Sequence, residues 1–325
     1  MDEPKWCLRV GAAVIAGALL LRLSSDPPKP LLNQPNMISF LIYLETGRKV
    51  RFSLSETQPP TEAARPVSAP AEEITFTAED GERINFKNDS HKDFDPGELI
   101  ELPLNWDLTG ETPGILILHT HATESYTKAS GETYEESSDY RTLDTGHNLV
   151  SVGTRLTNLL EEGGLSVIHS KVLHDYPSYN GSYSAARRTM EEILAQNPAV
   201  RLVLDLHRDA SGDPDNQMKT EAMVDGQPSA QLMFVVGTDG SGLNHPGWRE
   251  NLSLAMKLQS LLEEKYPGLC RPINLRSQRF NQDKSPGALI VEVGAAGNTR
   301  EEALTAVSAL ADAILELQNG ANLVK

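Results

Sequence analysis

The sequence predicts an α/β domain with a mostly parallel, twisted sheet that carries helices on both faces. From Gly114 onward, short apolar runs of strand length alternate with longer amphipathic segments of helical period. Polar residues of catalytic type directly follow three of the apolar runs. Such alternation is typical of a parallel sheet covered by helices, in which the functional site lies at the carboxyl ends of the strands.

The predicted elements follow one another in a regular order. We expect strands at Ile115–Leu118, Leu165–His169, Leu202–Leu206, Leu232–Val236 and Leu289–Val293, and helices near His147–Glu161, Ser184–Ala195, Trp248–Lys265 and Arg300–Gln318. Thr299 and Glu302 form a T-x-x-E capping box, which marks the start of the last helix. Residues 114–325 are therefore predicted to be the catalytic domain.

The segment before this domain, residues 73–113, has a mixed character. Its runs Ile74–Thr77 and Ile84–Phe86 alternate like short strands around the turn signal Asp80-Gly81. The segment is either a small β appendage or a lead-in that extends the core.

Residues 1–24 are predicted to be a signal anchor. The apolar run Val10–Leu21 is flanked by basic residues, which is typical of an export signal. It is shorter than the ~20 residues that span a bilayer, so spanning would require the flanking side chains to snorkel. No A-x-A-like cleavage site follows it directly, which favours a retained anchor. We expect a cell-membrane protein with an extracytoplasmic catalytic domain.

Residues 25–72 are predicted to be a tether. The stretch Ser55–Glu73 is rich in Pro, Ala, Glu and Ser, and Val67 is its only sizeable apolar residue. Such a stretch cannot bury enough apolar surface to order itself.

Composition excludes some classes of function. The 325 residues carry a formal net charge of -16, which argues against partners that are bound through phosphates, so nucleic acid is not expected. The two cysteines, Cys7 and Cys270, are far apart and provide neither a disulfide framework nor a cysteine zinc site. A metal would have to be held by histidine and carboxylate.

The three polar strand ends supply such a set. A hydrolytic zinc site needs three protein ligands with an open position, together with a carboxylate that moves protons. His121 and Glu124 form an H-x-x-E pair after the first strand, and His207 follows another strand. These three residues are the predicted zinc ligands, and Glu292 is the predicted catalytic carboxylate.

Four further residues are candidates at the same edge. His119 is an alternative ligand to His121, or orients it, and Asp144 lies in a polar loop where a carboxylate could reach a metal. His174 lies in a loop after a strand and is a candidate for substrate contact. Arg208, if it faces the cleft, is suited to bind a carboxylate of the substrate.

These residues belong to longer strings that resemble the catalytic domain of stage II sporulation protein P. The strings are L-N-W-D-L-T-G-E-T-P-G-I-L-I-L-H-T-H-A-T-E-S-Y from Leu104, H-D-Y-P-S-Y-N from His174, D-L-H-R-D-A from Asp205, and E-V-G from Glu292 with Asn298-Thr299. The resemblance covers nearly all of the chain from Leu104 to Gln318.

The resemblance implies a membrane-anchored protein that cleaves peptidoglycan during engulfment of the forespore, with amidase and endopeptidase activity. It implies a lytic transglycosylase and a membrane protein of the engulfment machinery as partners. The catalytic domain of the family is similar to zinc amidases, which implies zinc held by His121, Glu124 and His207, with Glu292 as the catalytic carboxylate. In zinc amidases generally the carboxylate ligand lies just before the first helix, which makes Asp144 an alternative to Glu124.

Two other functions are compatible with the sequence. One is a metallocarboxypeptidase or deacylase that acts on soluble peptides, although the anchor and the tether favour an immobile polymer. The other is a metal-free binding module that recruits partners in the cell envelope.

Overall fold

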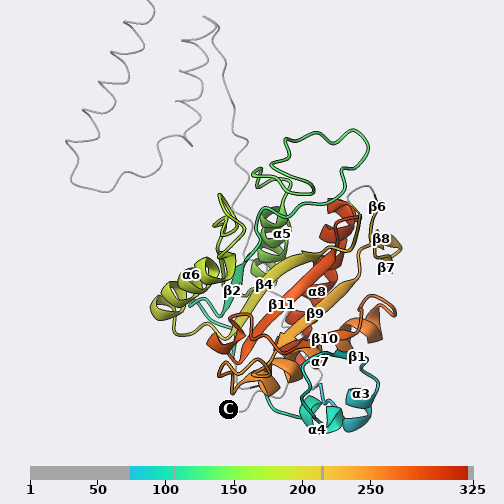
Figure 1. The fold of residues 1–325 in the computed structure, drawn as a ribbon. Coiled ribbons are helices and arrows are strands. Elements are labelled where there is room, and N and C mark those ends of the chain that lie inside the picture. The colour runs from blue at the N-terminus through green and yellow to red at the C-terminus, as the bar shows by residue number, and fades with distance from the viewer. Residues whose placement is uncertain (1–73, 105–106, 214–215, 321–325) are drawn as a thin grey trace, which may run out of the picture. The chain divides into compact units, whose positions relative to one another are not determined.

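A seven-stranded sheet forms the centre of the molecule in the computed structural model, which describes residues 74–104, 107–213 and 216–320 (Figure 1). The described residues belong to one compact unit, Pro70–Lys325. The strand order is β1-β10-β9-β11-β4-β2-β3, and all neighbouring pairs are parallel except β9 and β11. The strands are β1 (Phe86–Asn88), β2 (Ile115–Leu118), β3 (Val167–His169), β4 (Leu202–Asp209), β9 (Leu232–Gly237), β10 (Ile273–Arg276) and β11 (Gly287–Ala295).

Helices cover both faces of this sheet, which confirms the predicted fold class. Leu204 and Ile117 point to one face, where they pack in a single core cluster with α5 (Leu149–Glu162), α7 (Trp248–Lys265) and α8 (Arg300–Gly320). Leu118 and Val203, their neighbours along the strands, point to the other face and pack against α6 (Ser182–Gln196). This alternation follows from the two-residue period of a strand.

Part of the α6 face is covered by two aromatic side chains. Met233, Val235 and Ile290 of β9 and β11 form a small apolar cluster of their own. Tyr183, at the start of α6, and Phe280, in the loop after β10, pack against this cluster. This part of the sheet borders the candidate site described below.

The lead-in segment extends the core. Strand β1 pairs with β10 at the edge of the main sheet, and the Ile74 amide donates a hydrogen bond to the Gly320 carbonyl (2.6 Å). Two short helices, α3 (Ala78–Glu82) and α4 (Pro96–Ile100), lie together at this edge (Figure 1). Of the two alternatives for residues 73–113, the structure therefore shows an extension of the core.

The strand expected at Ile74–Thr77 does not form, and Asp80-Gly81 lies in helix α3 instead of a turn. The cause is a helix start at Thr77, whose amide and hydroxyl both donate to the Asp80 carboxylate (2.9 and 2.8 Å). Gly81 is required because a Cβ atom there would lie 2.4 Å from the carbonyl oxygen of Pro96.

The other predicted elements are present, with small changes at their ends. Helix α5 begins at Leu149, because the Asn148 side chain accepts a hydrogen bond from the Val150 amide and caps it. The capping box of α8 is confirmed: the Thr299 amide donates to Glu302, and the Glu302 amide donates to the Thr299 hydroxyl (3.0 and 3.3 Å). Besides helices α3 and α4, the elements that were not predicted are β10, the short helix η2 (Gln282–Lys284), and two hairpins, β5 (Gly212–Asp213) with β6 (Asn216–Gln217) and β7 (Ala222–Val224) with β8 (Gln227–Ser229).

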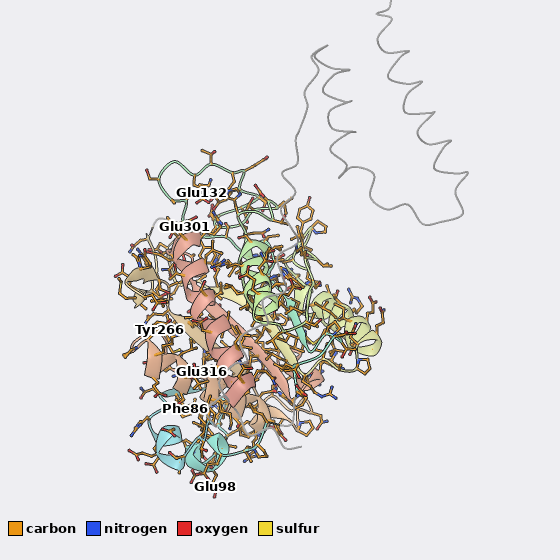
Figure 2. All side chains as sticks on the ribbon, turned by 180° about the vertical axis from the view of Figure 1, so that it is seen from behind. Phe86, Glu98, Glu132, Tyr266, Glu301 and Glu316 are labelled. Carbon is orange, nitrogen blue, oxygen red and sulfur yellow. The ribbon has the colours of Figure 1, made fainter. Side chains whose placement is uncertain are left out.

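Helix α8 is buried along most of its length and exposes Glu301 and Glu316, which Figure 2 labels on its outer side. At its start, Arg300 contacts both Glu301 (2.8 Å) and Glu132 (3.5 Å). Glu132 belongs to the long loop between β2 and α5, so this contact holds the loop against the helix.

The end of β11 is fixed by a buried asparagine. The Asn298 side chain accepts hydrogen bonds from the amides of Thr220 (3.1 Å) and Ala295 (3.0 Å), and it donates one to the Thr220 carbonyl (2.7 Å). Gly294 adopts a left-handed conformation (φ 68°) in which a Cβ atom would lie 2.6 Å from Ala230. Both features position the strand that carries Glu292.

The predicted anchor (residues 1–24) and tether (residues 25–72) lie outside the described residues. Within residues 74–104, 107–213 and 216–320, no helix is long and apolar enough to cross a membrane.

Candidate catalytic site

The predicted site residues His121, Glu124, His207 and Glu292 lie in one cluster. Glu292 of β11 is in register with His207 of β4, so the two side chains are neighbours on adjacent parallel strands. The rings of His121 and His207 are perpendicular, with centroids 5.2 Å apart. His207 Nδ1 lies 4.0 Å from Glu124 Oε2. The prediction that these strand ends converge is confirmed, while their chemical roles stay predictions.

A tight turn connects His121 to Glu124. The Glu124 amide donates to the His121 carbonyl (3.1 Å), which closes the H-x-x-E turn at the end of β2. The buried Glu124 side chain accepts a hydrogen bond from the Arg208 amide through Oε2 (3.2 Å) and meets Arg141 Nη2 through Oε1 (3.3 Å).

Asp205 is a site residue that the sequence reasoning missed. Its carboxylate accepts hydrogen bonds from the Thr120 amide (2.7 Å) and hydroxyl (2.6 Å). Its Oδ1 also lies 3.2 Å from His207 Nε2, so the carboxylate and the imidazole are in direct contact. Asp205 and His207 are two residues apart on one strand and therefore share a face, a signal that was available in the sequence.

Negative charge is concentrated around His207. Burial alone would lower the pKa of His207, but the carboxylates of Asp205, Glu292 and Glu124 outweigh it and raise the pKa to about 10. Burial would likewise raise the pKa of Asp205, but His207 and the hydrogen bonds from Thr120 lower it. The centre therefore favours a cation at this point.

Glu292 differs from the other carboxylates of the cluster. Burial, followed by repulsion from Glu124 and Asp209, raises the pKa of Glu292 to about 8 against the opposing effect of His207. Its side chain is half-buried, and Oε2 is buried without a hydrogen-bond partner among the described residues. A carboxyl group with a pKa near neutrality is suited to accept and return a proton.

Two tyrosines flank His121. The Tyr179 ring stacks on it (centroids 4.5 Å apart, planes at 8°), and the Tyr183 ring meets it edge-on (5.5 Å). Burial and the charge of His207 lower the pKa of His121 to about 4. Its Nδ1 is buried and has no hydrogen-bond partner in the described part of the chain.

Arg141 is a second residue that the sequence did not identify as part of the site. Its guanidinium contacts Asp175 (2.6 Å) and Glu124 (3.3 Å) and lies over the Tyr179 ring, 4.9 Å from its centroid. Arg141 therefore links the β2–α5 loop, which carries it, to the loop before α6.

The two alternative ligands lie elsewhere. His119 turns toward α5, and its Nε2 lies 2.9 Å from Nε2 of His169 at the end of β3. Burial lowers the pKa of His119 to about 3. A Cβ atom at Gly153 of α5 would lie 2.6 Å from both of these nitrogens. The exposed Asp144 pairs with His147 (2.9 Å) and has no contact with His121 or His207.

The two residues predicted to bind substrate make hydrogen bonds within the protein, and their substrate roles stay predictions. Arg208 is buried and donates to the carbonyls of Ser125 (2.9 Å) and Tyr140 (2.8 Å), so its guanidinium braces a loop. His174 is buried, and its ring nitrogens contact the His119 carbonyl (2.8 Å) and the Thr189 hydroxyl (2.9 Å). Both side chains therefore contribute hydrogen bonds to the fold itself.

The donor set of the cluster fits zinc chemically. In the described residues, no three histidine, cysteine or acidic side chains already converge on one point at ligating distance. The partnerless nitrogen of His121, the carboxylate of Glu124 and the carboxylate-flanked imidazole of His207 nevertheless supply two nitrogens and one oxygen, the donors of a catalytic zinc site. The excess of carboxylates around them favours a divalent cation.

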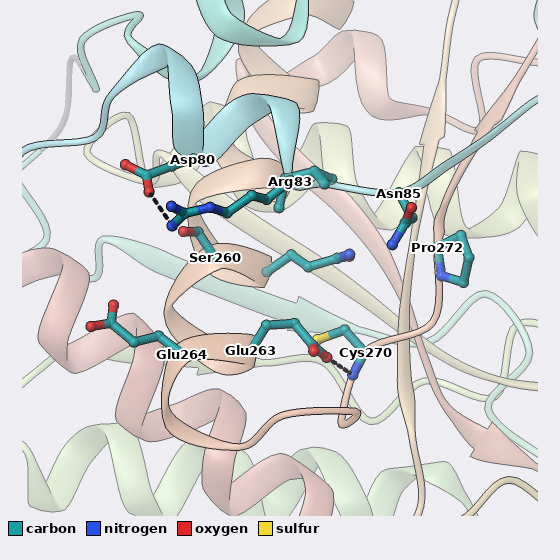
Figure 3. A pocket seen from close by; sticks show the side chains of 10 residues that line it. Asp80, Arg83, Asn85, Ser260, Glu263, Glu264, Cys270 and Pro272 are labelled. Atoms are coloured by element: carbon teal, nitrogen blue, oxygen red, sulfur yellow. Dashed lines mark hydrogen bonds and ion pairs between the residues drawn. The ribbon is translucent and has the colours of Figure 1, made fainter.

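A cavity of about 510 Å³ lies away from this cluster, between α3, α7 and the start of β10 (Figure 3). Its lining includes Arg83, Gln259, Glu263 and Cys270, and none of the candidate catalytic residues. There the Glu263 carboxylate accepts a hydrogen bond from the Cys270 amide (2.6 Å), as Figure 3 shows. We place the chemistry at the strand ends, because the imidazoles of His121 and His207 lie there beside Glu292, whose pKa is raised.

Fold and site together define an α/β protein with a histidine–carboxylate centre at the carboxyl ends of β2, β4 and β11. The sequence matches the family of Stage II sporulation protein P (SpoIIP) over residues 34–315. The chain belongs to this family.

Relatives and solved structures show further likeness. Stage II sporulation protein P of Bacillus subtilis (strain 168) is 31% identical over 221 residues, which cover 64% of this chain and 52% of that protein. The amidase AmiC2 of Nostoc punctiforme has a TM-score of 0.38 at 13% identity, covering 64% of this chain and 97% of its own. The CwlD amidase of Clostridioides difficile, solved with the GerS lipoprotein, has a TM-score of 0.39 at 13% identity, covering 62% and 96%. At these TM-scores the structural likenesses carry no conclusion about chemistry.

Proposed function

We propose that this chain is a zinc-dependent peptidoglycan hydrolase of the N-acetylmuramoyl-L-alanine amidase type that acts in sporulation. Membership of the Stage II sporulation protein P family supports the biological setting and the polymer substrate. The alignment with the B. subtilis relative spans about half of that protein, so the activity is argued from the residues of this chain.

His121, Glu124 and His207 are the residues that would hold the ion. Zinc, when bound, would polarise the scissile carbonyl and make water more acidic. Asp205 fixes the orientation of the His207 ring, because it lies against one ring nitrogen and is itself held by Thr120.

Glu292 is the proton carrier in this proposal. It takes a proton from the attacking water and returns it to the leaving amine, which needs a carboxyl whose pKa lies close to the working pH. Because the leaving group is the amine of the peptide, proton return is required for the carbon–nitrogen bond to break.

The observation that carries the proposal is the register of β11 against β4. It sets the half-buried Glu292, with its raised pKa and partnerless Oε2, directly beside the imidazole of His207. A purely structural glutamate in that position would be expected to have a hydrogen-bond partner, because burying an unpaired polar atom is costly.

The test uses the purified full chain, with zinc content and release of stem peptides from peptidoglycan as readouts. We expect about one zinc per chain, and release that stops when zinc is chelated and returns when it is restored. Glu124→Gln should weaken zinc binding, because it replaces an anionic ligand by a neutral amide. Release that is indifferent to chelation would rule out zinc dependence, and absence of release from the zinc-treated chain would favour the metal-free binding module.

Mass spectrometry of the products separates the bonds that are cut. Release of intact stem peptides that begin with L-alanine identifies amidase activity, and fragments cut within the stem or the cross-link identify endopeptidase activity. Hydrolysis confined to soluble peptides would favour the metallocarboxypeptidase or deacylase alternative.

We also propose that residues 1–24 anchor the chain to the cell membrane and that residues 25–72 tether an extracytoplasmic catalytic domain. The lytic transglycosylase and membrane protein of the engulfment machinery are the proposed partners. Cell fractionation followed by limited proteolysis tests the anchor: full-length protein in the membrane fraction should yield a soluble core and a small membrane-bound fragment. Recovery of the whole protein from the cytosol would remove the premise of an envelope substrate.

A further inference from the structure

A second cavity begins beside the candidate catalytic cluster. It measures about 370 Å³, and six of the residues that line it define what we call the α6 groove: Tyr183, Arg187, Leu243, Gln278, Arg279 and Phe280. Tyr183 joins the groove to the centre, because its ring meets His121 edge-on and stacks over His207 (centroids 5.5 and 6.3 Å apart).

The sheet surface beneath the α6 groove extends from Glu292. Glu292 is paired in register with Met233, and Ile290 with Val235, so these side chains form a strip on the α6 face of the sheet. Tyr183 and Phe280 pack on the strip, with ring centroids 5.7 Å apart. A substrate chain that is bound at the centre and extends along this face would therefore contact apolar and aromatic side chains first.

The groove is cationic on a protein that is otherwise strongly acidic. Its lining contains two arginines and no carboxylate, whereas the whole chain has a net charge of -16. Both Nη atoms of Arg187 donate hydrogen bonds to the Asp283 carboxylate (3.0 and 3.1 Å). Arg279 is half-buried and has weaker contacts, with Asp283 at 3.5 Å and the Asn244 carbonyl at 3.2 Å. Because a guanidinium has five N–H donors, Arg279 retains capacity for a carboxylate.

The loop that carries Arg279 is held in a strained conformation. Phe280 and Asn281 are consecutive non-glycine residues with left-handed backbones (φ 50° and 65°). The Gln282 side chain fixes this loop to β9, because it accepts a hydrogen bond from the Gly237 amide (2.7 Å) and donates one to the Val235 carbonyl (2.8 Å). The Asn281 side chain donates to the Tyr183 carbonyl (2.8 Å). Strain of this kind persists where the surrounding structure enforces it and is concentrated at functional sites.

We propose that the α6 groove binds the acidic stem peptide of the substrate, with Arg279 receiving a free carboxylate and with Phe280 and Tyr183 covering the peptide chain. This inference rests on the proposed function and names the part of the substrate that the groove selects. The ligand class is a short peptide that carries free carboxylates.

The test compares two soluble ligands, an N-acetylmuramoyl stem peptide with free carboxylates and the same compound with every carboxylate converted to an amide. Binding is measured by calorimetry on the full chain carrying Glu292→Gln, so that turnover does not consume the ligand. We expect the free acid to bind about 10- to 100-fold more tightly, as one charge-assisted hydrogen-bonded pair provides. Adding Arg279→Gln should bring this ratio close to one, and Arg279→Lys should retain part of it.

Two further variants control for the fold and for the place of binding. Arg249→Gln removes an arginine of α7 that lies over Trp248, outside the groove, and should leave the ratio unchanged. Phe280→Gly fits the left-handed backbone and removes the whole apolar side chain without touching a charge, so both ligands should bind about 3- to 10-fold more weakly with the ratio retained. A ratio that Arg279→Gln leaves intact, or affinities that Phe280→Gly does not change, would overturn the assignment.

The binding ratio is independent of turnover. Failure of the wild-type chain to release stem peptides from peptidoglycan would count against the proposed function. Release without any preference for free carboxylates would count against the groove alone.

Discussion

Glu292→Gln should stabilise the metal-free protein while it removes catalysis. Glutamine keeps the shape of glutamate but has no charge to bury and no proton to exchange. Because burial is the largest influence on the pKa of Glu292, the ionised carboxylate is a net cost to the fold when no metal is bound.

The size of this cost follows from the pKa. The pKa of Glu292 rises from 4.5 to about 8 on folding, so the folded protein holds this proton more tightly than the unfolded chain does. The group costs nothing below about pH 4.5, and its cost grows as the pH rises toward 8. The part of this difference that applies at pH 7 corresponds to about 3 kcal/mol. Since the side chain is only half-buried, we expect ~1–3 kcal/mol after allowing for solvent screening.

The assay is urea denaturation of the chelator-treated full chain at pH 4.5, 7 and 8.5. Glu292→Gln should unfold at higher urea than the wild type at pH 7 and 8.5, and at nearly the same urea at pH 4.5. Glu264→Gln changes an exposed glutamate of α7 and should remain within about 0.5 kcal/mol at every pH. A Glu292→Gln protein that is less stable than the wild type at pH 8.5 would refute the reasoning.

The same variant should keep its zinc and lose turnover by about 10²- to 10⁴-fold, the usual contribution of a positioned acid or base. Zinc content and stem-peptide release, measured on one preparation, decide this. Loss of zinc from Glu292→Gln would instead make Glu292 a ligand.

Three further substitutions test other parts of the structure. His207→Ala should abolish zinc binding while His147→Ala retains it, and full zinc occupancy in His207→Ala would remove the ligand assignment. Gly153→Ala should cost ~1–3 kcal/mol of stability, because its Cβ would lie 2.6 Å from His169 Nε2, and His169→Ala should recover part of the loss; a stabilised Gly153→Ala protein would contradict this packing. Asn298→Ala should cost ~2–5 kcal/mol in urea denaturation, because buried amides lose their acceptor, and a loss below about 1 kcal/mol would mean that water replaces it.

The fold class could be predicted because the buried strands are continuous apolar runs. Strand β10 was missed because Ile273-Asn274-Leu275-Arg276 contains only two apolar residues, and α3 was missed because Asp80-Gly81 usually marks a turn. The antiparallel pairing of β9 with β11 could not be predicted either. Apolar pattern identifies a buried strand, but strand direction depends on how the connections pass over the sheet.

The candidate cluster could be predicted because the carboxyl ends of β2, β4 and β11 lie at one edge of the sheet. Asp205 could have been found from its two-residue spacing to His207. Arg141 could not, because the loop that carries it has no periodicity. Sequence also could not reveal that both ring nitrogens of His174 have partners, since its hydrogen bonds to the His119 carbonyl and the Thr189 hydroxyl depend on contacts between distant segments.

The hydrogen bond between Ile74 and Gly320 has a consequence for protein engineering. A short flexible linker from residue 320 to residue 74 would close the described unit into a ring. New ends could then be opened at Asp225-Gly226, the exposed turn of the β7–β8 hairpin, where both residues have left-handed backbones. Such a circular permutant would begin with β8 and end with β7, and it would keep the same centre with a different order of elements along the chain.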